Sequence, residues 1–182
     1  MTQRQVWRRS LFTAIAACLV ILSLDQFTKW VVLRELGPGG TRDEIDVIPG
    51  LLQFIFVRNT GSAFGLFQGS SDVLKVVSLV VIVALAAYYA RAAMRDWVLA
   101  LAMGLQLGGA LGNVIDRFRH GYVVDFIDVP RWPTFNVADS GITVGVVLLM
   151  YALLFREPRI ERELADDPNQ RRIATQTPRE DV

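Results

Sequence analysis

Four long apolar segments, separated by charged stretches, constrain the fold of this chain more than any other feature. A membrane-spanning helix needs about 20 mostly apolar residues. Residues 11–33, 73–90, 97–115 and 137–155 each meet this requirement. We therefore expect an all-α membrane protein with four transmembrane helices. The alternating apolar pattern at residues 51–57 is typical of short strands and predicts a small β element in the first outer connection.

The distribution of basic residues predicts how these helices are oriented. Cytoplasmic segments of membrane proteins carry an excess of Lys and Arg. The N-terminal tail, the second connection and the C-terminal tail together hold eleven arginines, whereas the first and third connections hold six. Both termini should therefore be cytoplasmic. We predict a four-helix transmembrane domain at residues 1–155, followed at residues 156–182 by a polar, disordered cytoplasmic tail.

Composition argues against several classes of function. The formal net charge is +1, so no basic field indicates nucleic-acid binding. The chain has one cysteine, Cys18, and one histidine, His120. Zinc sites usually draw about three or four ligands from Cys, His and carboxylates. With one residue of each kind, neither a metal site nor a Ser–His or Cys–His mechanism is well supported, and no cofactor is expected.

Polar and ionisable residues gather at one predicted membrane face. Such residues within or beside spanning helices are costly and are candidates for function. On the four-helix topology they fall at the outer ends of three helices and in two outer connections. They are Asp25, Lys29, Asn113, Asp116, Arg117, Asp125, Asp128, Asn136 and Asp139.

Each of these groups also has a purely structural interpretation. Asp25 and Lys29 are four residues apart, a spacing that suits an ion pair within one helix. Asn136 or Asp139 could cap the last helix, and Arg117 could anchor its helix at the lipid headgroups. The glycines between residues 108 and 112 could simply allow close helix packing.

Five short motifs, in this order along residues 10–155, resemble those of the lipoprotein signal peptidase (type II) family. The order of the motifs makes the resemblance specific, because any one of them alone would be weak. The motifs are Asp25-Gln26-Phe27-Thr28-Lys29, Asn59-Thr60-Gly61-Ser62-Ala63-Phe64, Gly108-Gly109-Ala110-Leu111-Gly112-Asn113-Val114-Ile115-Asp116-Arg117, Val124-Asp125-Phe126-Ile127-Asp128 and Phe135-Asn136-Val137-Ala138-Asp139-Ser140.

The resemblance implies an aspartic endopeptidase of the bacterial cytoplasmic (inner) membrane. Its substrate would be a diacylglyceryl-modified prolipoprotein, cut just before the lipidated cysteine, and globomycin-type cyclic peptides would inhibit it. The two catalytic aspartates of the family match Asp125 and Asp139, at the outer face of the membrane. The family's supporting polar residues match Asp25, Lys29, Asn59, Gly61, Asn113, Asp116, Arg117 and Asn136.

Two carboxylates held close together share a proton near neutral pH, so one can activate water while the other protonates the substrate. The sequence does not say which aspartate holds the proton.

A small proton-coupled transporter is the main alternative, because membrane carboxylates also form proton relays. A relay, however, should place its acids near the middle of the bilayer or on both faces. A structural subunit without chemistry is a further alternative.

Overall fold

A computed structural model describes residues 3–61 and 96–156, together with isolated helical positions between residues 76 and 87. The predicted span at residues 73–90 lies largely outside the described residues. The predicted tail lies outside them from residue 157 onward.

Three described helices are long and apolar enough to cross a membrane. They are α1 (Gln3–Glu35), α3 (Trp97–His120) and α4 (Val137–Tyr151). A short π-helical turn, η2 (Ala152–Arg156), extends α4 at its C-terminal end. The described part of the chain therefore confirms three of the four predicted spans. Both α1 and α3 are longer than predicted, because apolar composition marks the lipid-facing length of a helix, not the residues at which its backbone hydrogen bonding ends.

The ends of α3 are defined by side-chain and backbone caps. The Asp96 carboxylate accepts a hydrogen bond of 2.8 Å from the Val98 backbone N–H, which satisfies one of the free donors of the first turn. At the other end, Gly121 has φ 79°, the left-handed conformation that glycine adopts most easily, and its N–H bonds the Arg117 carbonyl. The helix therefore continues five residues beyond its last predicted apolar position.

Helix α3 packs between α1 and α4. In the most apolar part of α3, 61% of residues are buried, against 11% in α1 and 22% in α4. A Cβ atom on Gly108 would overlap Ile21 and Cys18 of α1, and one on Gly109 would overlap the Ala138 backbone of α4. The predicted role of these glycines in close packing is confirmed.

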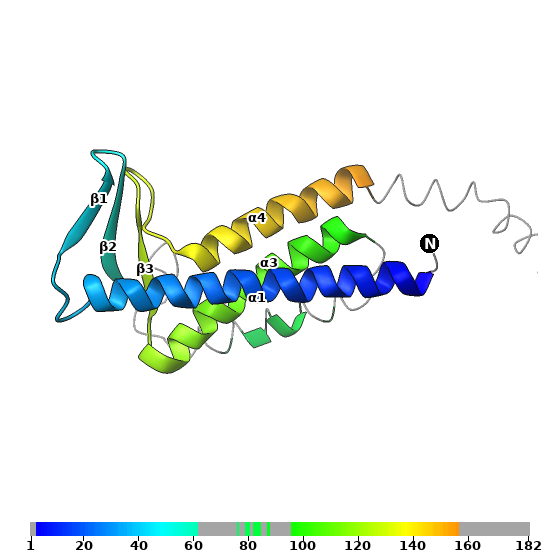
Figure 1. Ribbon diagram of the computed structural model, residues 1–182, viewed down its shortest axis with the longest axis horizontal. Coiled ribbons are helices and arrows are strands. Elements are labelled where there is room, and N and C mark those ends of the chain that lie inside the picture. The colour runs from blue at the N-terminus through cyan, green and yellow to red at the C-terminus, as the bar shows by residue number, and fades with distance from the viewer. Residues whose placement is uncertain are drawn as a thin grey trace, which may run out of the picture.

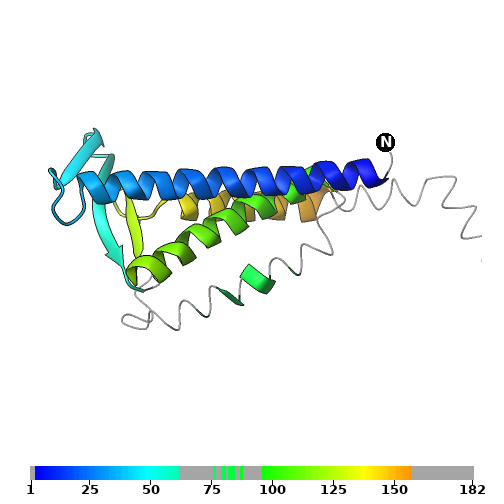
Figure 2. The same ribbon diagram turned by 60° about the horizontal axis from the view of Figure 1, so that its bottom comes forward.

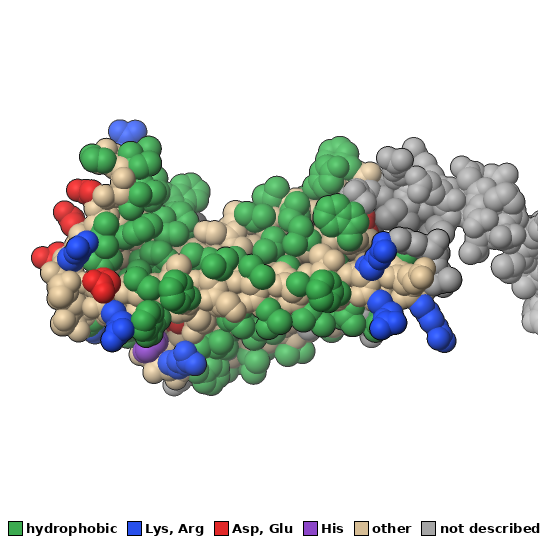
Figure 3. Space-filling view, in the orientation of Figure 1, with side chains coloured by type: hydrophobic (Ala, Val, Ile, Leu, Met, Phe, Trp, Pro, Cys, Tyr) green, Lys and Arg blue, Asp and Glu red, His purple; other side chains and the backbone are tan. Residues whose placement is uncertain are grey.

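The outward faces of the helices are apolar over most of their length. Phe12 and Phe27 of α1 are 73% and 61% exposed, and Leu154 beyond α4 is 60% exposed. In the space-filling view, hydrophobic side chains cover the middle of the molecule, whereas charged side chains gather at its two ends (Figure 3). This distribution fits a chain whose helices face lipid.

A three-stranded antiparallel sheet lies across the end of the helices where α1 finishes and α4 begins (Figures 1 and 2). Its strands are β1 (Glu44–Ile48), β2 (Leu52–Asn59) and β3 (Val123–Asp128), in the order β1-β2-β3. The predicted β element at residues 51–57 is confirmed as β2. Asp125 lies in the connection between α3 and α4, as expected, but on strand β3, which pairs with β2 at this position and was not predicted.

The inner face of the sheet packs on the last turns of α1. Val124 and Phe126 of β3 are buried together with Val32 and Leu36 of α1. The Phe126 ring also meets Phe54 of β2 edge-on, with centroids 5.8 Å apart. This apolar contact fixes β3 against the helices and so sets the position of Asp125, whose neighbours on the strand are buried.

Candidate active site between the sheet and the helix ends

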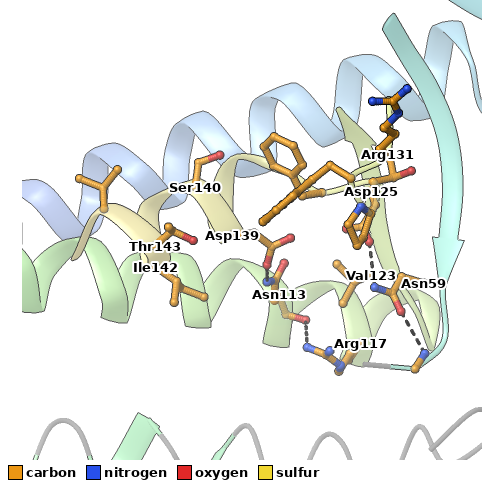
Figure 4. Close-up of a pocket in the computed structure, with 16 residues that line it drawn as sticks. Asn59, Asn113, Arg117, Val123, Asp125, Arg131, Asp139, Ser140, Ile142 and Thr143 are labelled. Carbon is orange, nitrogen blue, oxygen red and sulfur yellow. Dashed lines mark hydrogen bonds between the residues drawn. The ribbon is translucent and has the colours of Figure 1, made fainter. Parts of the chain in front are cut away.

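A pocket of about 750 Å³ opens between the sheet, the end of α3 and the start of α4 (Figure 4). Asp125 and Asp139 both line it. Among the residues that the structure describes, the lining comprises Asn59, Gly61, Asn113, Arg117, Val123, Asp125, Arg131, Trp132, Pro133, Thr134, Phe135, Asp139, Ser140, Ile142, Thr143 and Val144.

Asp125 lies on β3 and is only 2% exposed. Its Oδ2 accepts a hydrogen bond of 2.8 Å from Asn59 Nδ2, and its Oδ1 accepts one of 2.7 Å from Asn136 Nδ2. The pKa of Asp125 is raised from 3.8 to about 6, mainly by burial; the nearby charge of Asp139 contributes to this rise, while both asparagine donors oppose it. This carboxyl therefore takes up a proton closer to neutral pH than an ordinary aspartate does.

Asp139 lies in the first turn of α4, within a capping box. Its backbone N–H donates to Asn136 Oδ1 at 2.9 Å, while its Oδ2 accepts from the Asn136 backbone N–H at 3.3 Å. Its Oδ1 accepts from Asn113 Nδ2 at 2.8 Å. The predicted capping role of these residues is confirmed, and the same contacts hold the Asp139 carboxylate in the pocket.

Two asparagines connect the carboxylates. Asn136 Nδ2 donates to Asp125 and, at 3.2 Å, to Asn113 Oδ1, while Asn113 Nδ2 donates to Asp139. Each amide thus has its nitrogen directed toward an acid and its oxygen accepting from another donor. One hydrogen-bonded array therefore holds Asp125, on strand β3, and Asp139, on helix α4.

Beneath this array lies a buried ionic cluster. Lys29 Nζ is 2.9 Å from Asp25 Oδ2 and 2.9 Å from Asp116 Oδ2, and it also donates to Asn113 Oδ1 at 2.9 Å. Lys29 and Asp25 are 2% and 0% exposed. The predicted Asp25–Lys29 ion pair is therefore confirmed, and the structure adds Asp116 as a second partner.

The two acids of the cluster also hold the elements that carry the pocket carboxylates. Asp25 Oδ1 accepts a 2.9 Å hydrogen bond from the Ala138 backbone N–H at the start of α4. Asp116 Oδ2 accepts a 3.0 Å bond from the Val124 backbone N–H on β3. Because buried charges need partners, the cluster makes the placement of α1, α3, β3 and α4 mutually dependent.

The other predicted site residues lie at the edge of the pocket. The Gly61 backbone N–H donates to Asn59 Oδ1 at 3.1 Å, which leaves Asn59 Nδ2 directed at Asp125. Arg117 is half-buried, and its guanidinium donates to the Asn113 carbonyl at 3.4 Å. The sequence also suggested Arg117 as an anchor at the lipid headgroups. That interpretation is less well supported, because Arg117 lines the pocket.

Known proteins that are similar to this chain in sequence and in fold identify its family. A family model described as Signal peptidase (SPase) II matches residues 17–155. The lipoprotein signal peptidase of Moorella thermoacetica is 42% identical over 137 residues, covering 75% of this chain and 89% of the relative. That of Syntrophomonas wolfei is 42% identical over 144 residues, covering 79% and 94%. A bacterial membrane enzyme solved by the in meso method at 1.9 Å resolution superposes with a TM-score of 0.72 at 34% identity, covering 80% of this chain and 95% of that one.

The chain belongs to the signal peptidase II family. It is therefore an aspartic peptidase of a bacterial membrane that removes signal peptides from prolipoproteins. The family assignment expected from the five motifs is confirmed, and the transporter alternative is not favoured.

Nine of the ten residues predicted for the site of this signal peptidase lie in the pocket lining or in the ionic cluster. The tenth, Asn136, belongs to the hydrogen-bonded array between Asp125 and Asp139. The prediction missed Gln26, whose Nε2 lies 3.3 Å from Asp25 Oδ2 and 3.2 Å from Asp116 Oδ1. Its position directly after Asp25 within an apolar span was a usable signal. Arg131 and Ser140, which also line the pocket, carried no comparable signal.

Proposed function

We propose that Asp125 and Asp139 form the catalytic pair of this signal peptidase. The proposal rests on one observation above all: both carboxylates line the same pocket and are held there by Asn113 and Asn136, which are themselves hydrogen-bonded to each other. The remaining supporting residues are those of the buried cluster and of the pocket edge: Asp25, Lys29, Asn59, Gly61, Asp116 and Arg117.

We assign the shared proton to Asp125 in the resting enzyme. Burial, together with the nearby charge of Asp139, raises the pKa of Asp125 to about 6, so this carboxyl holds a proton more readily than an ordinary aspartate does. Asp139 accepts hydrogen bonds from Asn113 and from the Asn136 backbone at the start of α4, where the partial positive charge of the helix lies. These contacts hold the Asp139 carboxylate in the pocket lining, in position to take a proton from water.

With this assignment the reaction needs only the two acids and water. Asp139 removes a proton from a water molecule, which attacks the carbonyl carbon of the scissile peptide. Asp125 donates its proton to the carbonyl oxygen. The tetrahedral intermediate then collapses: the C–N bond breaks, the proton on Asp139 passes to the leaving amine, and one hydroxyl of the intermediate returns its proton to Asp125 as the new carboxylic acid forms. General acid–base steps of this kind each contribute about 10² to 10⁴ in rate.

We further propose that the substrate is a diacylglyceryl-modified prolipoprotein, cut before the lipidated cysteine. The pocket is lined on one side by Ile142 and Val144 of the spanning helix α4 and on the other by Asn59 of the sheet. A substrate whose lipid stays in hydrocarbon while its scissile bond meets water fits this change in polarity. A globomycin-type cyclic peptide would compete for the same space.

The complete topology that we propose has four spans, with both termini cytoplasmic. Residues 73–90 supply the second span, and the excess of arginines in the tails and second connection sets the orientation. On this topology the pocket lies at the outer face of the cytoplasmic membrane, where the signal peptide ends and the mature lipoprotein begins.

The substrate assignment is tested with the purified enzyme in detergent or lipid. It should cleave a diacylglyceryl-modified prolipoprotein and leave untouched the same precursor without the lipid, and a globomycin-type peptide should inhibit competitively. Equal cleavage of both precursors would contradict the requirement for lipid.

A further inference from the structure

Arg131 is a cationic residue of the pocket to which neither the motifs nor the catalytic proposal assigns a role. It lies in the connection between β3 and α4, and its side chain is exposed. In the close-up, Arg131 lies at the opposite end of the pocket from Ile142 and Thr143, with Asp139 and Asp125 between these two ends (Figure 4).

The backbone holds Arg131 in an unusual conformation. Its φ is 66°, which makes it the sole non-glycine residue with positive φ in the ranges that the structure describes. The connection around it is closely tied: the Trp132 N–H donates to the Val129 carbonyl at 3.0 Å, and Phe135 exchanges hydrogen bonds of 2.8 and 3.1 Å with Ile127. A left-handed non-glycine residue persists only where its surroundings determine it, and such residues gather at ligand sites.

No acidic side chain in the described part of the chain neutralises the charge of Arg131. Among the described residues it forms no ion pair. The nearest acid along its own connection, Asp128, has its two carboxylate oxygens occupied, one by Gln53 Nε2 at 2.7 Å and the other by the Thr134 hydroxyl at 3.3 Å. The guanidinium therefore remains available to a molecule that occupies the pocket.

The direction of the substrate determines which part of it meets this charge. The signal peptide and the acyl chains belong to the bilayer, and Ile142, Thr143 and Val144 lie on the spanning helix α4. A substrate chain with its lipid at that end passes Asp139 and Asp125 and leaves the pocket at the Arg131 end. The residues that leave there are the first ones after the lipidated cysteine.

We propose that Arg131 is a specificity-determining residue, which favours acidic and disfavours basic residues immediately after the lipidated cysteine. The inference rests on the proposed catalytic pair, since that pair fixes where the scissile bond lies. Because the guanidinium is exposed, its effect is modest. An ion pair of this kind changes the rate about threefold, and the effect weakens as salt rises.

The test uses three lipidated prolipoproteins that differ only in carrying Asp, Asn or Lys at the position immediately after the lipidated cysteine. The wild-type enzyme should give kcat/KM values in the order Asp, Asn, Lys, with about threefold between the extremes. Arg131→Asn keeps a residue that tolerates the left-handed conformation and should abolish the preference. Arg131→Glu should reverse it.

Arg42→Asn is the matched control, because Arg42 is an exposed arginine before β1 and does not line the pocket. It should keep the wild-type preference. An equal loss with all three substrates in Arg131→Glu would indicate an anchor at the lipid surface and overturn the inference, as would a wild-type enzyme that cleaves all three equally. Cleavage of none of them by the wild type would instead overturn the proposed function, and the inference with it.

Discussion

The hydrogen bond that Asn59 donates to Asp125 determines where the pH dependence of cleavage should fall. The bond is 2.8 Å long and reaches a carboxyl that is only 2% exposed. Asn59 lowers the pKa of Asp125 because it stabilises the ionised form. Asn59→Ala should therefore raise the pKa of Asp125 above its present value of about 6.

The size of this shift follows from the strength of the bond. A hydrogen bond to a charged group contributes about 1.5–3 kcal/mol, and one pKa unit corresponds to about 1.4 kcal/mol. Water in the open pocket replaces part of the lost donor, which leaves a rise of about one unit. If Asp125 acts in its protonated form, activity falls as pH rises through this pKa. The high-pH fall of the variant should therefore lie about one unit above that of the wild type.

The assay is the pH profile of kcat/KM on a lipidated prolipoprotein, with Gln53→Ala as the control. Gln53 makes the corresponding bond from the same strand, donating to Asp128 at 2.7 Å, but neither residue lines the active-site pocket. Its loss should leave the profile unmoved. A shift of the low-pH limb in Asn59→Ala, or no shift at all, would refute the assignment of the proton to Asp125.

Three further predictions concern stability. Lys29→Met leaves two buried carboxylates without their cation and should destabilise the folded protein by about 3–5 kcal/mol, measured by unfolding in detergent. Adding Asp25→Asn and Asp116→Asn should recover most of this loss, and no recovery would argue against a charge effect. Because the folded pKa of Asp125 is raised from 3.8 to about 6, its contribution to stability is complete below pH 4 and is lost as pH rises through 6. The difference in unfolding free energy, Asp125→Asn minus wild type, should therefore grow by up to about 3 kcal/mol between pH 4 and pH 7. A difference that does not change with pH would contradict the raised pKa. Gly108→Ala places a methyl group where α1 already lies and should cost about 1–3 kcal/mol; an unchanged melting temperature would show that the helices can separate freely.

The helices were predictable because the information for a spanning segment is local. An apolar block of sufficient length identifies itself without reference to the rest of the chain, and α1, α3 and α4 all lie where such blocks occur. Their ends were less predictable. The first turns of α1 contain Arg4, Arg8 and Arg9, which hydropathy excludes from the span although the helix continues through them.

The sheet was predictable only in part, because pairing depends on residues far apart in sequence. The alternation at residues 51–57 indicated β2. Strand β3 is short, and its partner lies more than 60 residues earlier, with Val57 opposite Asp125. No local pattern around Asp125 reports that contact.

The site itself was predictable from the side of the membrane on which its residues fall. Asp25, Asn113 and Asp139 lie on three different helices, and the expected topology brought them to one face before any contact was known. The contacts between them were not predictable. The resemblance marks Asn113 and Asn136 as supporting residues of the site. It does not show that they orient the two carboxylates, since asparagine amides serve equally well as caps, surface groups or ligands.

The central claim is that Asp125 and Asp139 act as one catalytic unit, and cleavage of a lipidated prolipoprotein by Asp125→Asn, Asp139→Asn and the double variant tests it most directly. Folding is checked for each variant by unfolding in detergent. Each single variant should lose about 10³ or more in kcat, and the double variant should lose no more than the worse single one, because residues of one unit are not additive. A single variant that cleaves at close to the wild-type rate, or losses that multiply in the double variant, would contradict the account.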